Sequence, residues 1–187
     1  MLFMNIFLDT ISPKNALILF DEKRNILEKY FFDVRLNEST LLIEEFDAFL
    51  KKNNVTYTDL ENIVVVNGPG SFTWVRTTVL MVNTINFVMK KNITTLTYFD
   101  LFENYPIIKT SSKRDSFVKM AKESEIEVIQ NQDLVKKLEN IQTIYWDIHL
   151  ENFEVITEVN YEKIIQNIVF QNKKIVPAYY LKKPNIS

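Results

Sequence analysis

The distribution of hydrophobic residues along the chain predicts strands and helices that alternate after an initial group of strands. Apolar-rich runs cover residues 2–8, 16–20 and 26–34, and short polar segments separate them. Runs of this length bounded by turns are typical of strands, and three in succession predict an antiparallel meander. Two later runs, Ile63–Val66 and Ile93–Tyr98, predict further strands within the first hundred residues.

A helix is predicted between the third and fourth strands, with Asn37 as its cap and its end near Lys52. Leu42, Phe46 and Phe49 recur at helical spacing, which gives the helix one apolar face. Leu41 and Ala48, seven residues apart, form a second, narrow apolar strip beside that face.

The segment from Ser71 to about Lys90 predicts a longer helix that is apolar on more than one side. One broad arc suits packing on a sheet and holds Phe72, Val75, Val79, Val82, Ile85 and Met89. Leu80 and Phe87 lie well outside this arc, flanked by Arg76 and Asn83. A second apolar face implies contact with another subunit, or with Leu41 and Ala48 of the neighbouring helix.

The pattern is weaker after residue 100, and it divides the chain into an N-terminal lobe, 1–100, and a smaller C-terminal lobe, 101–187, with a docking tail. The predicted elements of the second lobe are a hairpin over 107–118, strands at 125–129 and 142–145, and helices at 132–139 and 161–170. Pro177, Tyr179 and Tyr180 mark the tail, which we expect to dock through its two tyrosines.

Both glycines of the 187-residue chain, Gly68 and Gly70, lie in the turn between the fourth strand and the long helix. Glycine reaches positive φ without strain and permits close approach of another backbone or a ligand. Ser71 is in place to cap the helix. Such a turn suits either an anion at the helix N-terminus or a tight connection between strand and helix. The spacing matches neither a Walker loop nor a dinucleotide fingerprint, which favours the tight connection.

The residues of this turn resemble the signature of the TsaB family, also called YeaZ. The matched positions are Gly68, Pro69, Gly70, Ser71, Phe72, Thr73, Val75 and Arg76. The resemblance is close over 60–100, fair over 1–60 and faint afterwards except in the tail. It implies an α/β protein with the actin-like, sugar-kinase-like (ribonuclease H-like) fold: a mixed sheet with helices and a smaller, degenerate second lobe.

The resemblance also implies a function without catalysis. Family members are non-catalytic partners of TsaD in making N6-threonylcarbamoyladenosine on tRNA, with the TsaE ATPase as a further partner. They pair with TsaD, or with a second copy of themselves, through the two helices described above. The interface expected here comprises Leu41, Glu45, Ala48, Phe72, Trp74, Arg76, Leu80, Asn83 and Phe87.

A vestigial nucleotide site would comprise Asp9, Thr10, Gly68 and Gly70, because Asp9-Thr10 matches the family's Asp-Thr at the end of the first strand. The hairpin that follows lacks glycine, so we expect no nucleotide or other cofactor. Asp9 would then only cap the junction between strand and turn. The alternative function is a small ATP-dependent phosphotransferase or peptidase of the same superfamily.

Composition narrows the function further. A net charge of −2 gives no electrostatic footprint for autonomous nucleic-acid binding, so tRNA is expected to be reached through a complex. The absence of cysteine excludes thiol chemistry, and the single histidine, His149, cannot build a zinc site alone. The apolar start has no basic residue before it, which favours a buried first strand in a cytoplasmic protein over a signal peptide or membrane span.

Both tryptophans, Trp74 and Trp146, stand where the TsaB family tends to have glycine. An indole at position 74 would lie near the partner surface and obstruct close helix approach. One hypothesis is that the source organism reads UGA as glycine and that the sequence was translated with tryptophan. Reading the two codons and the native peptide masses decides it, and two UGG codons would refute it.

Overall fold

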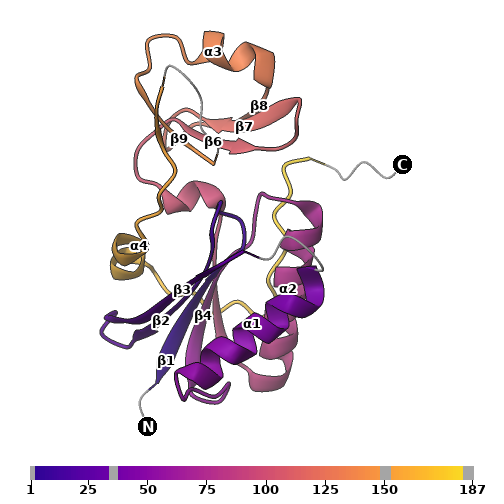
Figure 1. Ribbon diagram of the computed structural model, residues 1–187, viewed down its shortest axis with the longest axis vertical. Helices are drawn as coiled ribbons and strands as arrows, with labels where there is room; N and C mark the ends of the chain where they lie inside the picture. The colour runs from indigo at the N-terminus through magenta and orange to yellow at the C-terminus, as the bar shows by residue number, and fades with distance from the viewer. Residues whose placement is uncertain (1–2, 34–37, 148–152, 183–187) are drawn as a thin grey trace.

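The computed structural model describes residues 3–33, 38–147 and 153–182, which form two lobes, each with its own five-stranded sheet (Figure 1). The first lobe lies at the bottom of Figure 1 and the second at the top. Asn37, predicted to cap the first helix, and His149 lie outside the described residues.

The first sheet is mixed, as the sequence predicts. β1 (Met4–Asp9), β2 (Asn15–Asp21) and β3 (Ile26–Phe32) form the antiparallel meander, whereas β4 (Leu60–Val66) and β5 (Asn92–Leu96) run parallel to β1. The order of strands is β3-β2-β1-β4-β5. The central strands are buried along almost their whole length, which explains their continuous apolar runs.

Helices cover both faces of this sheet. α1 (Glu38–Lys52) and α2 (Phe72–Met89) lie side by side on one face, and α4 (Tyr161–Asn167) lies on the other (Figure 1). The Phe7 and Tyr161 rings pack edge to face, with centroids 5.5 Å apart. Arg24, in the β2–β3 turn, donates to the carbonyl of Ile168, 2.7 Å away, just beyond α4. Although α4 follows the second sheet in the sequence, it thus packs against the first sheet.

The second sheet follows the 3-10 turn η1 (Tyr98–Leu101) and has the order β10-β9-β6-β7-β8. β6 (Ile107–Thr110) and β7 (Asp115–Lys119) form the predicted hairpin. The other elements of this lobe are β8 (Ile126–Gln130), the 3-10 turn η2 (Asn131–Asp133), α3 (Leu134–Lys137), β9 (Thr143–Trp146) and β10 (Glu154–Ile156).

The structure departs from the sequence-based expectations mainly at helix ends and in the second lobe. The helix expected over 132–139 is a 3-10 turn followed by the short α3, and the helix expected over 161–170 ends at Asn167. The strand expected over Ile93–Tyr98 ends at Leu96, and Tyr98 begins η1 instead. Strand β10 was not predicted, because its three residues carry no alternating pattern long enough to recognise.

The tail after α4 returns to the first lobe and follows α2 (Figure 1). Val176 is buried in the main core, and Ala178, Tyr180 and Leu181 pack against it. Further along, Lys182 forms an ion pair with Asp115 at the start of β7. The tail therefore contacts both lobes.

Candidate functional site

The glycine turn between β4 and α2 is covered by the chain's own tail. The amide N–H of Tyr179 donates to the carbonyl of Asn67 at 2.9 Å, and a Cβ atom on Gly68 would lie only 2.4 Å from the carbonyl oxygen of Tyr179. Gly68 also has φ of +130°, a region that side chains disfavour. Glycine is required here because the tail backbone approaches closely.

The second glycine, Gly70, is also explained by a close contact within the chain. A Cβ atom on Gly70 would lie 2.9 Å from Cδ1 of Ile11, in the loop after β1. Ser71 occupies the N-cap position of α2, but its side chain makes no capping hydrogen bond, which corrects the expected role of its hydroxyl. The geometry is that of a tight strand-to-helix connection, the alternative that the spacing favours.

Asp9 is fully buried at the end of β1, with both carboxylate oxygens engaged by the protein itself. One oxygen accepts the amide N–H groups of Ile11 and Ser12 at 2.8 and 3.0 Å, and the other accepts the hydroxyl of Tyr161 at 2.9 Å. Thr10 shares a 2.7 Å hydrogen bond with Thr78 of α2. These contacts fix the loop after β1 and join it to α2 and α4.

A buried ion pair lies where the two lobes meet. Lys109 on β6 donates to Asp147 at 2.6 Å, and its ammonium also donates to the carbonyl of Ile11 at 2.9 Å. Asp147 further accepts the amide and hydroxyl of Thr110. The ammonium lies 4.7 Å from the centroid of the Tyr98 ring. Lys109 thus links the second sheet to the first lobe.

The two tyrosines near these carboxylates stay protonated. Burial, aided by the charge of Asp9 and its hydrogen bond, raises the pKa of Tyr161 far above its usual range. Burial also raises the pKa of Tyr98, and the charges of Asp147 and Asp9 add to the effect. Tyr161 therefore acts as a hydrogen-bond donor to Asp9 and is unsuited to proton transfer near neutral pH.

The described residues contain no group of three or more histidine, aspartate or glutamate side chains placed to hold a metal ion. No helix in the same part of the chain is long and apolar enough to cross a membrane.

Several exposed apolar residues lie on the outer face of the helix pair, on the right of the first lobe in Figure 1. Leu80 and Phe87 are 69% and 77% exposed, so they do not pack against Leu41 and Ala48 inside the chain, which was the alternative. Val88 on α2 and Ile43 on α1 are also exposed. Leu41 is half-buried and Ala48 is exposed. We call the exposed residues Ile43, Leu80, Phe87 and Val88 the apolar strip.

At the N-terminal end of α2, the tail covers part of the same face. Phe72 is half-exposed, and its ring lies 5.3 Å from that of Tyr180, measured between centroids. The guanidinium of Arg76 lies 5.0 Å from the centroid of the Phe72 ring. Aromatic and cationic groups thus extend the surface beyond the apolar strip.

Two other residues expected at the interface are held by internal hydrogen bonds. Glu45 accepts the hydroxyl of Tyr30 at 2.8 Å, and this bond raises the pKa of Tyr30. Asn83 donates to the carbonyl of Val176 at 3.0 Å and accepts its amide N–H at 2.8 Å. Their polar groups therefore position β3 and the tail.

Both tryptophans are accommodated by their surroundings. Trp74 on α2 is half-buried against the main core. Trp146 is buried in the core of the second lobe, and its indole N–H donates to the hydroxyl of Thr110 at 3.1 Å. The hypothesis of misread glycine codons stays a prediction.

Sequence reasoning did not single out Lys109, Asp147 or Tyr161. Asp9 and Tyr161 are far apart in the sequence, and Lys109 and Asp147 are brought together by the pairing of β6 with β9. Lys109 lies in a strand of four residues, Asp147 directly follows another, and Tyr161 begins a helix of seven residues. The only signal for Lys109 and Asp147 was a polar residue near the end of a strand, which is too common to identify a buried pair.

Comparison with known proteins places these features in a family context. Residues 36–102, about a third of the chain, match the family model described as TsaD, tRNA N6-adenosine threonylcarbamoyltransferase. The matched segment comprises α1, β4, the glycine turn, α2 and β5, and ends just after η1. No curated protein sequence matches the chain.

Two solved structures from Pseudomonas aeruginosa share its fold. YeaZ aligns with 15% identity and a TM-score of 0.54, over 68% of this chain and 64% of its own. A protein described as similar to the peptidase YeaZ aligns with 15% identity and a TM-score of 0.60, over 77% of this chain and 74% of its own. The chain thus spans slightly less than two thirds of YeaZ.

The resemblance to the TsaB (YeaZ) family is confirmed. The family model covers the glycine turn and both helices of the first lobe, and the two structures carry the same fold. The fold is therefore the actin-like, ribonuclease H-like α/β fold that the resemblance implies.

Proposed function

We propose that this chain is a non-enzymatic subunit that binds a TsaD-type protein and organises it for N6-threonylcarbamoyladenosine modification of tRNA. A TsaE-type ATPase is a further partner of the complex, and a second copy of the chain competes for the same face. The proposed location is the cytoplasm, where tRNA is available. The match of residues 36–102 to the TsaD family model and the fold shared with YeaZ support a role of this kind.

The observation that carries the proposal is the apolar strip on α1 and α2. Large apolar side chains gathered on one exposed face are typical of interaction sites, and Leu80 and Phe87, seven residues apart, lie on one such face of α2. Burying one such side chain on association is worth about 1.5–3 kcal/mol. The strip lies on α1 and α2, which are neighbours on one face of the first sheet, so a partner's helices can pack against it as a bundle.

The alternative, a phosphotransferase or peptidase, has less support in the geometry. Both oxygens of Asp9 are used by Ile11, Ser12 and Tyr161, and the glycine turn is filled by Tyr179. Opening a nucleotide site would break these contacts. If ATP binds the isolated chain and Asp9→Asn abolishes that binding, the result favours the enzymatic alternative over the subunit role.

The test is light scattering of the purified chain mixed with the TsaD homologue of the same organism. We expect a one-to-one complex that is lost in the Leu80→Asp, Phe87→Asp double variant. The matched control is Val128→Asp, Val135→Asp, which adds the same charges at exposed valines of the second lobe. The control should bind like the parent protein.

Two outcomes would count against the proposal. The first is failure of the chain to bind TsaD whether residue 74 is tryptophan or glycine. The second is loss of binding in the control variant as complete as in the double variant, which would show that added charge, and not loss of the apolar strip, abolishes binding.

A further inference from the structure

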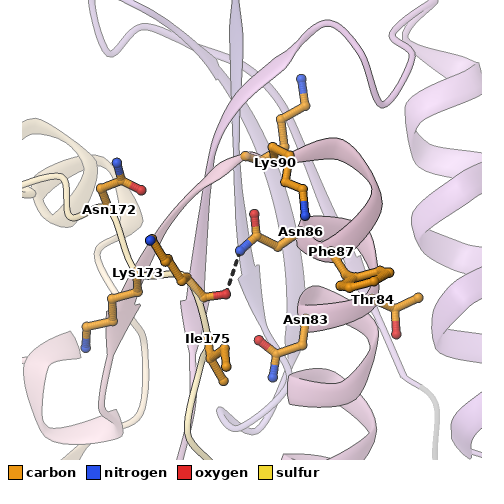
Figure 2. A pocket seen from close by; sticks show the side chains of 10 residues that line it. Asn83, Thr84, Asn86, Phe87, Lys90, Asn172, Lys173 and Ile175 are labelled. Atoms are coloured by element: carbon orange, nitrogen blue, oxygen red, sulfur yellow. Dashed lines mark hydrogen bonds between the residues drawn. The ribbon is translucent and has the colours of Figure 1, made fainter.

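A groove between the C-terminal end of α2 and the tail is bordered by four lysines and no acidic residue. It has a volume of about 730 Å³ and is lined by Lys90, Lys91, Lys173 and Lys174, together with Phe87 and polar side chains (Figure 2). In a chain where acidic residues outnumber basic ones, 24 to 22, this is a local concentration of positive charge.

The walls of the groove are held in place by hydrogen bonds. Asn86 of α2 donates to the carbonyl of Lys174 at 2.9 Å, the contact drawn as a dashed line in Figure 2. The amide N–H of Lys173 donates to the carbonyl of Ile93 on β5 at 3.1 Å. The tail is therefore a fixed wall opposite α2.

Most of the positive charge of the groove is uncompensated. Hydrogen bonds from Thr56 lower the pKa of Asp59 and the charge of Lys91 adds to this shift, so Lys91 has an acidic neighbour. Lys91 donates to the carbonyl of Thr58 at 2.9 Å, and Lys173 donates to the hydroxyl of Thr95. Both acceptors are neutral, so they position the ammonium groups without cancelling their charge. Across the described residues, none of the four lysines forms an ion pair.

Phe87 and Lys90 add a second type of contact at one end. The Phe87 ring is 77% exposed, and the Lys90 ammonium lies 4.8 Å from its centroid. An exposed aromatic ring beside lysines suits a base stacked next to its phosphate. The negative end of the α2 dipole opposes an anion here, but it amounts to about half a charge against four.

From this geometry we infer that the groove binds the sugar-phosphate backbone of a single-stranded nucleic acid, with Phe87 as a stacking surface, and RNA is the probe used to test it. The lysines are spread along both walls, which fits a chain of phosphates better than a single ion. This contact goes beyond the proposed partner role, and every group that forms the groove belongs to this chain. Phe87 also belongs to the apolar strip, so a partner that covers this ring excludes stacking on it, whereas the isolated chain leaves it exposed.

The test is fluorescence anisotropy of the full chain with a labelled single-stranded RNA over a salt series. The variant Lys90→Gln, Lys174→Gln removes two ammonium groups that donate no hydrogen bond within the described residues. The matched control is Lys113→Gln, Lys122→Gln on exposed turns of the second lobe. We expect the slope of log affinity against log salt to become shallower by about 1 to 1.5 in the groove variant alone.

Either of two results overturns the inference: equal slopes for the parent chain, the groove variant and the control, or equally tight binding of polyglutamate of matching length, which would assign the groove to an acidic peptide. Because the measurement uses the isolated chain, its failure leaves the TsaD proposal untouched. Failure of TsaD binding likewise leaves the RNA measurement valid.

Discussion

At Gly68, the requirement for glycine comes from two independent constraints. The residue has φ of +130°, and the Tyr179 carbonyl occupies the place of a Cβ atom at 2.4 Å. Gly70 differs, because its close neighbour is Cδ1 of Ile11, the far end of a flexible side chain. The two glycines of the family signature therefore have unequal tolerance to substitution.

We predict that Gly68→Ala lowers the free energy of unfolding by about 3 kcal/mol, because it adds backbone strain and displaces Tyr179. Gly70→Ala is the matched control and should cost about 1 kcal/mol, since Ile11 can shift. Urea unfolding of both variants measures the difference. Equal losses would show that the tail does not explain the glycine at position 68.

At the scale of elements, the first lobe was largely predictable and the second was not. β1, β2, β4 and α2 have long apolar patterns, and their observed bounds agree with prediction to within a few residues. α3 has four residues and β10 has three, too few for a periodic pattern to show.

The candidate site divides in the same way. Periodicity placed Leu80 and Phe87 outside the packing arc of α2, since it fixes the faces of a helix. Whether they pack on Leu41 and Ala48 was left open, and the structure shows both exposed. The hydrogen bonds between Asn83 and Val176 could not be predicted, because the sequence does not indicate where an irregular tail runs. Contacts between distant, unpatterned segments need the tertiary structure.

The tail is held to α2 largely by asparagine side chains, which suggests a test of its docking. Asn83 makes two hydrogen bonds with Val176, and Asn86 makes one with Lys174. We predict that Asn83→Ala, Asn86→Ala speeds hydrogen exchange of residues 173–179 and lowers the free energy of unfolding by about 2 kcal/mol.

Thr84→Ala is the control for this tail variant. Thr84 lies on the same helix, and its hydroxyl donates only to the Leu80 carbonyl of α2 itself. Exchange in the tail should stay at the parent rate. If both variants left the exchange of 173–179 unchanged, the asparagines would not be what fixes the tail.

At the scale of the whole molecule, the two lobes are joined by more than a linker. The separate core of the second lobe is small and comprises Ile108, Val118, Leu134, Leu138, Ile144 and Trp146. Two residues of the second sheet, Ile107 and Phe117, belong to the core of the first lobe. A small core stabilises a domain poorly by itself. We infer that the second lobe depends on the first for its stability.

The tryptophans allow this dependence to be measured, because each lobe carries one. Trp146→Phe leaves Trp74 to report on the first lobe, and Trp74→Phe leaves Trp146 to report on the second. We predict that the two fluorescence transitions in urea coincide. Lys109→Met, added to each variant, should lower stability by about 3 kcal/mol, because it leaves the buried Asp147 charge unpaired.

The position of Lys109 determines how the loss of stability is divided between the two lobes. Its ammonium is bonded to Ile11 in the first lobe and to Asp147 in the second, so its removal breaks the connection between them. The unfolding transition reported by Trp146 should then have its midpoint at a lower urea concentration than the transition reported by Trp74. Lys137→Met, which removes an exposed pair with Glu127 inside the second lobe, should keep the two transitions together. Separate transitions in the parent chain would contradict the dependence, since they would show that each lobe unfolds alone.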